Sequence, residues 1–133
     1  MRTPRGSLNQ SRRRVLAASG AVLLAAGSLR AVSSRPVDNQ TQRRAALINR
    51  FFGGSHDARA VGASYLTAEP AERDADFLWT RLFGSNEPRD RATCSRLLAE
   101  RIAEDFRNRD VVHIQGWIVA RAEARACALI HLS

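Results

Sequence analysis

The sequence DRATCSRLLAERIAEDFR at residues 90–107 carries the chain's strongest helical pattern, and VVHIQGWIVA at residues 111–120 replaces it with a pattern typical of strands. In the first segment, one stripe at helical spacing is apolar and consists of Cys94, Leu97, Leu98, Ile102 and Phe106. In the second segment, two β-type runs flank the dipeptide Gln115-Gly116. This spacing indicates a β-hairpin with a two-residue turn, although Gln is less usual than Asn or Asp at the first turn position.

Three segments before this helix also have helical features. Residues 41–52 repeat apolar side chains at helical spacing before Gly53-Gly54, which ends the pattern. Residues 56–67 indicate a shorter second helix, in which Gly62 costs about 1 kcal/mol relative to alanine. Pro70 fits the first turn of a third helix that ends at Gly84, and several acids crowd the same end, where negative charge favours a helix start.

Residues 121–131 predict a last helix that buries Ala122, Ala126, Leu129 and Ile130. Glu123 stands at the third position of this helix, from which a capping-box acid reaches back to the cap residue, but the cap position holds Ala120. The expected fold class is mainly α, a small bundle of four to five short helices with one β-hairpin near the C-terminus.

The basic charge of the chain is concentrated in its first 33 residues. The formal net charge is +8, and all 21 basic residues are arginine. Six of them lie in residues 1–33, which contain no acid, so 15 arginines stand against 13 acids in the remainder. A nucleic-acid binder usually shows a basic stripe with interleaved aromatic residues, whereas these arginines alternate with acids. We therefore expect no nucleic-acid partner.

Residues 1–33 contain the parts of an export signal in the expected order. A polar, basic segment ends at Arg14, and the uncharged stretch Val15–Leu29 follows. This stretch of 15 residues is shorter than the roughly 20 that a membrane-spanning helix needs. Ala31 and Ser33 then stand in the small-x-small relation that a signal peptidase reads. The pattern predicts a removable signal and no permanent membrane span.

The segment Ser11-Arg12-Arg13-Arg14-Val15-Leu16 resembles the twin-arginine (Tat) export consensus. Ser11, Arg12, Arg13 and Leu16 match it, and Val15 replaces the commoner Phe. The resemblance implies the Tat translocon as a partner during export and the periplasm as the destination. An Arg-rich transit peptide or a plain membrane anchor is the alternative. The expected organisation is a signal peptide at 1–33, a flexible tether at 34–40 and a single small helical domain at 41–133.

Cys94 and Cys127 are the only cysteines, and each falls on or beside the inward stripe of a predicted helix. Buried thiols acting as small apolar groups are the first interpretation. A disulfide is the second, because the predicted destination is oxidising and the number is even. A redox-active pair is disfavoured since no Cys-x-x-Cys is present, and the missing Cys-x-x-Cys-His motif excludes covalent haem.

No catalytic, cofactor or metal site is predicted from the motifs. His56, His113 and His131 lack the short spacings of a zinc site. A metal would need acids such as Asp105 or Asp110, which no spacing requires. The chain has no Gly-x-Ser-x-Gly nucleophile elbow and no phosphate-binding glycine loop.

Trp79 and Trp117 are the largest apolar side chains, and burial in the core is the preferred expectation for them. Trp117 follows a tight turn, so partial exposure is the alternative, and exposed tryptophan is enriched at protein interfaces. If a partner protein exists, Trp117 and Tyr65 are the candidate contact residues.

Residues 110–125, DVVHIQGWIVARAEAR, are similar to a C-terminal hairpin and helix of small bacterial Tat-exported proteins. In those proteins Ser or Thr often opens the last helix, whereas this chain has Ala120. The size and leader also resemble the small accessory subunits of periplasmic or membrane-bound flavin-dependent sugar and polyol dehydrogenases, which bind no cofactor and accompany the flavoprotein through export. That second resemblance concerns the overall organisation of the chain and assigns no role to any residue.

These observations favour a non-enzymatic, exported accessory or escort subunit that binds a larger periplasmic oxidoreductase and carries no cofactor of its own. The alternative is a small free-standing periplasmic enzyme or ligand-binding protein whose site is built from dispersed residues.

Overall fold

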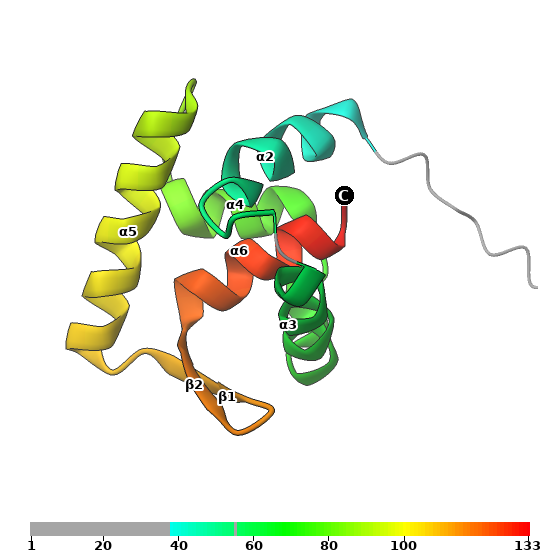
Figure 1. Cartoon of the computed structure of the whole chain (residues 1–133), viewed down its shortest axis with the longest axis vertical. Coiled ribbons are helices and arrows are strands. Elements are labelled where there is room, and N and C mark those ends of the chain that lie inside the picture. Colours follow the sequence, from blue (N-terminus) through cyan, green and yellow to red (C-terminus); the bar gives the residue numbers. More distant parts are fainter. Residues whose placement is uncertain (1–37, 55) are drawn as a thin grey trace, which may run out of the picture. The chain divides into compact units, whose positions relative to one another are not determined.

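The protein is described by a computed structural model over residues 38–54 and 56–133. It is mainly helical, with an antiparallel β-hairpin close to the C-terminal end (Figure 1). In chain order the elements are α2 (Asn39–Asn49), α3 (His56–Ala68), the 3-10 helix η1 (Pro70–Glu72), α4 (Ala75–Phe83), α5 (Arg91–Asn108), β1 (Val111–Ile114), β2 (Trp117–Ala120) and α6 (Arg121–His131). The predicted fold class is confirmed.

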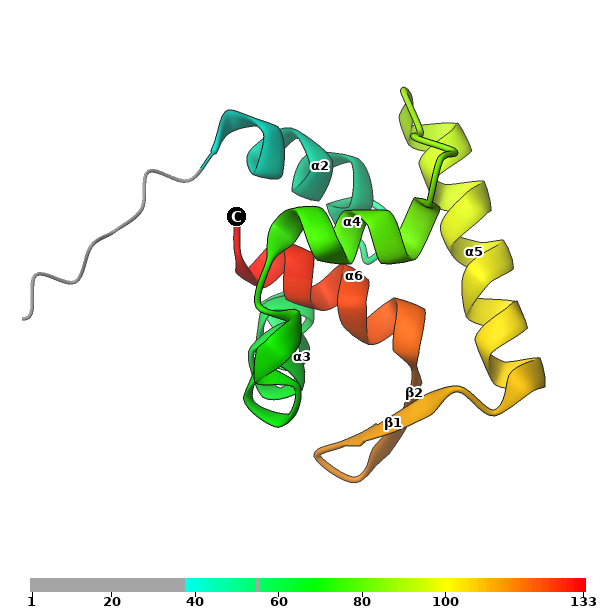
Figure 2. The same cartoon turned by 180° about the vertical axis from the view of Figure 1, so that it is seen from behind.

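Helix α6 is the centre of the fold. It packs against α2, α3, α4 and α5, and the opposite views in Figures 1 and 2 show these helices around it. The four residues expected to be buried are buried, together with Ala124, Arg125, Cys127 and Ala128. A helix that is covered on nearly every side is a core element, because a surface helix buries only one stripe.

The closest helix contact is made by α3 against α6 at Gly62. A Cβ atom added to Gly62 would lie 2.8 Å from Cα of Ala128 and closer still to the carbonyl group of Cys127. Real side chains do not approach a backbone so closely, so only glycine allows this separation of the two helices. The glycine that lowers the helix propensity of α3 is therefore required by the packing of α3 on α6.

Asp105 of α5 supplies the cap that α6 lacks in its own sequence. Its Oδ2 accepts a hydrogen bond from the backbone N–H of Ala122 at 2.6 Å, and Asp105 is buried. The Ala120 side chain makes no cap bond. An N–H group at the start of α6 is thus satisfied by a residue of another helix.

The prediction of a third helix that starts at Pro70 is wrong at that end. Pro70 begins the short η1, and α4 begins only at Ala75. The Asp74 backbone is extended, and its carboxylate accepts a hydrogen bond from the N–H of Phe77 at 2.7 Å, which makes Asp74 the N-cap of α4. The acids near Pro70 are therefore divided between η1 and α4 and do not all lie at the start of one helix.

Helices α5 and α2 begin at aspartate caps as well. Asp90 accepts hydrogen bonds from the N–H and the hydroxyl of Thr93, both at 2.8 Å, and so fixes the start of α5. Asp38 caps α2 by accepting from the N–H of Gln40 at 3.3 Å. Residues 39 and 40, which the sequence assigned to the tether, therefore lie in the first turn of α2.

The β-hairpin lies where the sequence predicted it. Val111 pairs with Ala120 and Ile114 pairs with Trp117. The two turn residues, Gln115 and Gly116, both have positive φ angles of 51° and 83°, as a type I′ turn requires. Nε2 of Gln115 donates a hydrogen bond to Oγ of Ser64 at 2.9 Å, which attaches the turn to α3.

Trp79 of α4 is in the core, as expected. The centre of its ring lies 4.5 Å from that of Phe83, and the guanidinium group of Arg44 lies 5.0 Å from the Trp79 ring centre. Arg44 also forms an ion pair with Asp76. Cation–π and ionic contacts of Arg44 therefore connect α2 with α4.

Replacing Gly62 by Ala should destabilise the protein, even though alanine is the better helix former. Overpacking against α6 is expected to cost about 1–3 kcal/mol, against a propensity gain of about 1 kcal/mol. Urea denaturation followed by circular dichroism measures the net loss. The control is Ala60→Gly at an exposed position of the same helix, which reports the propensity difference alone. A gain in stability for Gly62→Ala equal to the loss for Ala60→Gly would contradict the close contact.

Candidate functional site

A polar cluster joins α3, η1 and α6. Arg125 donates two hydrogen bonds to the Glu72 carboxylate, from Nε to Oε2 at 2.8 Å and from Nη2 to Oε1 at 2.7 Å. The Tyr65 hydroxyl donates to the same Oε2 at 2.7 Å. The side chains of Arg125 and Glu72 expose only 10% and 14% of their surface. This bidentate pair is therefore both well oriented and shielded from solvent.

Arg121 extends the polar cluster toward the base of the hairpin. Its Nε donates to Oδ1 of Asp110 at 2.7 Å, and its Nη1 donates to Oε1 of Glu69 at 3.4 Å. Arg121 also acts electrostatically on the Tyr65 hydroxyl and lowers its pKa, against the larger effect of burial. The arginines of the two arginine–carboxylate pairs thus lie one helical turn apart on α6, and Tyr65 contacts Glu72 of the neighbouring pair.

The electrostatics of the polar cluster keep its charges fixed at neutral pH. The hydrogen bonds from Arg125 lower the pKa of Glu72 below its ordinary value. Burial raises the pKa of Tyr65 to about 12, and the hydrogen bond to Asp110 raises the pKa of Arg121. A general acid or base works best with a pKa near the operating pH. The pKa values of these groups are shifted away from neutral pH. The cluster is therefore suited to holding the elements together rather than to transferring protons.

Sequence reasoning did not find this cluster. It assigned Glu72 to a helix start and gave Arg125 no role, although Arg125 is one of the few buried charged residues. The available signal was the spacing of Arg121 and Arg125, four residues apart on a helix that is otherwise rich in alanine. An arginine on the covered side of a core helix requires an acidic partner.

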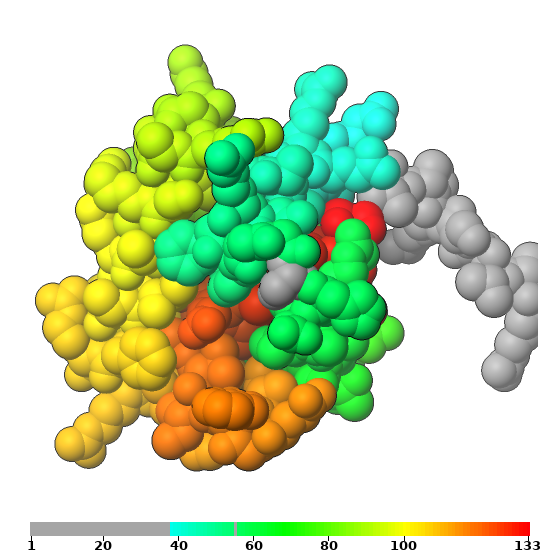
Figure 3. Space-filling model, viewed as in Figure 1, coloured from blue at the N-terminus to red at the C-terminus, as the bar shows by residue number. Residues whose placement is uncertain are grey.

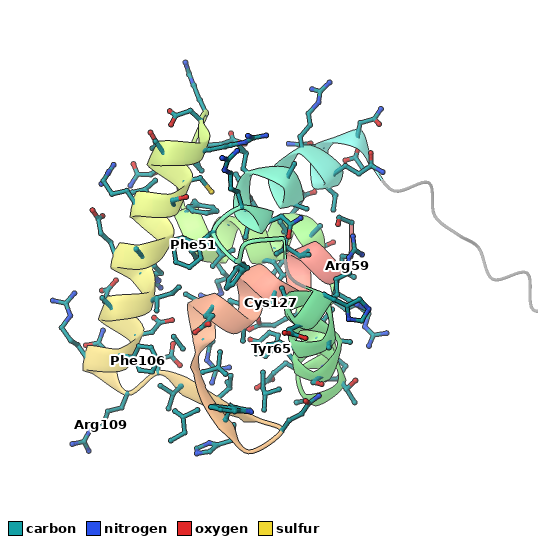
Figure 4. The ribbon with its side chains drawn as sticks, viewed as in Figure 1. Phe51, Arg59, Tyr65, Phe106, Arg109 and Cys127 are labelled. Carbon is teal, nitrogen blue, oxygen red and sulfur yellow. The ribbon has the colours of Figure 1, made fainter. Side chains whose placement is uncertain are left out.

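The two cysteines lie in the core on different helices. Cys94 of α5 and Cys127 of α6 are free and buried, and Figure 4 labels Cys127 on α6. Burial raises the pKa of Cys94 to about 11 and that of Cys127 to about 12. Because the thiolate is the reactive form, both thiols are poor nucleophiles in this fold. A disulfide between them stays a prediction.

The histidines and the acids named as metal-ligand candidates do not form a metal-binding group in the described residues. His56, His113 and His131 are all exposed. Asp105 is engaged with the N–H of Ala122, and Asp110 is engaged with Arg121. Over residues 38–54 and 56–133, no group of three or more His, Cys, Asp or Glu side chains is placed to hold a metal ion.

The two candidate contact residues have opposite environments. Trp117 is 75% exposed, so the preferred expectation that it lies in the core is wrong, and its neighbour Ile118 is 60% exposed. Tyr65 exposes only 1% of its surface, which rules it out as a surface anchor. The difference has a geometric cause. Tyr65 is on the side of α3 that faces α6, whereas the hairpin turn projects beyond α6 (Figure 1).

The exposed end of the hairpin, formed by Trp117 and Ile118, presents apolar groups on both of its faces. Successive residues of a strand point to opposite sides. Trp117 therefore shares a face with its pairing partner Ile114, and Ile118 shares the other face with the exposed His113. In the space-filling view the hairpin, in orange, forms the lower edge of the surface (Figure 3).

The residues of the export signal, Ser11, Arg12, Arg13 and Leu16, lie outside the described residues. Within the described part of the chain, no helix has both the length and the apolar character needed to cross a membrane.

The chain matches no protein-family model, no curated protein and no solved structure. Its function is therefore inferred from its own residues.

Replacing Glu72 by Gln should lower stability at pH 7 by about 2–4 kcal/mol, because Arg125 would lose its counter-charge in a shielded place. The effect should depend on pH. A carboxylate whose folded-state pKa is lowered adds stability above its unfolded pKa of about 4.3, and this contribution is lost as the pH falls through the folded-state pKa. The difference in urea midpoint between the wild type and Glu72→Gln should therefore shrink on acidification.

The control for this comparison is Glu100→Gln, which removes an ion pair with Arg96 whose two side chains are each 60% exposed. Exposed pairs contribute about 0–1 kcal/mol, so the control should change stability little at any pH. A Glu72→Gln deficit that stays constant with pH would show that the interaction with Arg125 does not depend on charge.

The thiols of Cys94 and Cys127 should not react in the folded protein, and both should react after unfolding. A thiol reagent such as DTNB should label neither cysteine at neutral pH without denaturant, since both are buried with raised pKa values. In guanidinium without reductant, both should react. If the unfolded protein reacts only after reduction, Cys94 and Cys127 form a disulfide.

Proposed function

We propose that the protein is an exported, non-enzymatic accessory or escort subunit that binds a larger periplasmic oxidoreductase through the exposed end of its hairpin. The observation that carries this proposal is the exposure of Trp117 and Ile118 in a chain whose other tryptophan, Trp79, is buried. Tryptophan is enriched among the residues that dominate binding energy at protein interfaces. An exposed tryptophan beside an exposed isoleucine is therefore a suitable anchor for a partner protein.

The shape of the anchor indicates how the partner would bind it. Because Trp117 and Ile118 lie on opposite faces of β2, a flat partner surface could cover only one of them. A groove that receives the end of the hairpin would cover both. The hairpin is attached at its turn through Gln115 and at its base through Asp110, so little ordering would be required on binding.

The polar cluster and the two cysteines support a binding role over a catalytic one. The polar cluster has its charges fixed by mutual pairing, and both cysteines have pKa values far above neutrality. Groups adjusted for chemistry would have pKa values moved toward the operating pH instead. Trp117 and Ile118, by contrast, are exposed apolar groups to which the described part of the fold gives no packing role.

The export part of the proposal rests on the leader sequence. A cofactor-free chain of this size could use the simpler unfolded route, so a leader resembling the Tat consensus favours a companion that must fold before export. The larger oxidoreductase would be that companion and would carry the cofactor.

Export is tested by replacing Arg12 and Arg13 with lysine. The precursor should then stay in the cytoplasm, as shown by fractionation and immunoblotting. The matched control changes Arg2 and Arg5 to lysine, which makes the same chemical change outside the twin-arginine pair and should leave export intact. Continued export of the first variant through the general secretory route would overturn the Tat assignment.

Partner binding is tested by affinity recovery of the tagged protein from gently extracted periplasm and membranes. A larger protein should be recovered in stoichiometric amount, and Trp117→Ala should weaken its binding roughly 30-fold, as loss of a hot-spot residue does. Phe77→Ala is the control, because Phe77 is also a partly exposed aromatic residue but lies on α4. A monodisperse monomer recovered alone would favour the free-standing alternative.

A further inference from the structure

Two adjoining hollows lie along α2 on the surface of the protein. The larger, of about 620 Å³, is lined by Ala46, Asn49, Arg50, Gly53, Gly54 and Arg91. The second, of about 270 Å³, shares Ala46 and Asn49 with it and continues toward Arg59 and Ser133. Figure 3 shows the loop that follows α2 beside the first turns of α5, and Figure 4 shows Arg59 at the start of α3 near the end of α6. We call the two hollows together the α2 groove.

The arginines of the α2 groove have no internal partner. Arg50, Arg59 and Arg91 are exposed, and none of them forms an ion pair with another described residue. Arg44 and Arg125, by contrast, form ion pairs with acids of other elements. Three exposed arginines with no ion pair to another described residue therefore line the two shallow hollows.

Acidic side chains do not line either hollow. Asp38 and Asp90, which lie close in sequence to the groove, are occupied as helix caps. The last carbonyl groups of α2 are also occupied, because Asn49 and Arg50 accept hydrogen bonds from the N–H groups of the following loop. The groove thus presents donors and positive charge, and a concave basic surface concentrates anionic groups.

We infer that the α2 groove binds an acidic segment of another protein, with carboxylates paired to Arg50 and Arg91 and a further carboxylate to Arg59. This inference rests on the proposed accessory function and adds the chemistry of a second contact with the partner. Arginine suits the task because its planar guanidinium pairs with a carboxylate through two parallel hydrogen bonds. The small side chain of Ala46 and the absence of side chains at Gly53 and Gly54 leave the groove open for a backbone to approach.

An acidic peptide fits the groove better than a nucleic acid does. No aromatic side chain lines either hollow, so bases would find no stacking surface there. Beyond residue 33 the chain has 15 arginines against 13 acids, which provides little long-range attraction for a polyanion. A short segment with a few carboxylates needs only the local charge of the groove.

The test uses the purified full-length chain and a fluorescein-labelled decaglutamate peptide, with binding followed by fluorescence anisotropy at low salt. The double variant Arg50→Ala with Arg91→Ala should weaken binding about 2- to 30-fold, as expected for the loss of two exposed ion pairs. The matched control is Arg43→Ala with Arg89→Ala, which removes the same charge from exposed arginines that line neither hollow. The control should change binding less than twofold.

Equal weakening by the two double variants would overturn the inference, because it would show attraction by net charge alone. Tighter binding of a labelled oligothymidylate that depends on Arg50 and Arg91 would overturn it in favour of a nucleic acid. A decaglutamate peptide with a terminal photo-crosslinker gives the location, and crosslinks should fall within residues 42–54, at Arg59 or at Arg91. Crosslinks confined to other parts of the chain would place the peptide elsewhere and refute the site.

Failure of the groove inference can be distinguished from failure of the proposed accessory function. If the partner recovered with the wild type is lost on Trp117→Ala but kept at full strength by the Arg50 and Arg91 double variant, the accessory function stands and the groove inference fails. If no partner is recovered from cells, the accessory function fails, while the peptide titration and crosslinking still decide whether the groove binds acidic segments.

Discussion

The packing of α3 on α6 at Gly62 is the contact on which the rest of the fold depends. The backbone of α3 lies so close to Cys127 and Ala128 that no side chain fits between them. Alanine and cysteine dominate the buried surface of α6, and such small residues let the neighbouring helices come near. Close packing of this kind gains dispersion contacts but tolerates little added volume. The small volume of these side chains allows α2, α3, α4 and α5 to pack around α6.

Polar interactions then fix the segment that connects α5 to α6. Asp105 caps α6 from outside the helix. The backbone carbonyl of Asp110 accepts a hydrogen bond from the N–H of Arg121 at 3.0 Å, and its carboxylate pairs with the Arg121 side chain. The carbonyl and carboxylate groups of Asp110 therefore close the base of the hairpin by binding Arg121. Together with the Asp105 carboxylate, they orient the start of α6. Rigidity at the base explains how the opposite end can keep Trp117 exposed without a covering helix.

The periodic elements of the fold could be predicted from sequence, and the contacts between distant segments could not. The helix over residues 90–107 and the Gln115-Gly116 turn report local structure, and both were placed correctly, but Phe106 at the end of the predicted inward stripe is 49% exposed. Pro70 and its neighbouring acids were assigned to one helix because composition does not show that Asp74 starts a new one. The pairing of Glu72 with Arg125 and the cap that Asp105 provides at Ala122 join residues 17 or more positions apart. Exposure of Trp117 was equally undetermined, since alternation along a strand does not say where the covering helices end.

The hairpin end and the α2 groove are chemically different, and a partner that used both would gain more than the sum of two weak contacts. Apolar burial of Trp117 and Ile118 is insensitive to salt, whereas pairing with Arg50 and Arg91 is screened as ionic strength rises. Exposed ion pairs add little affinity by themselves but raise association rates and select against partners of the wrong charge. A protein with apolar anchoring at one surface and charge selection at another can thus bind firmly while rejecting other exported proteins that offer only a hydrophobic groove.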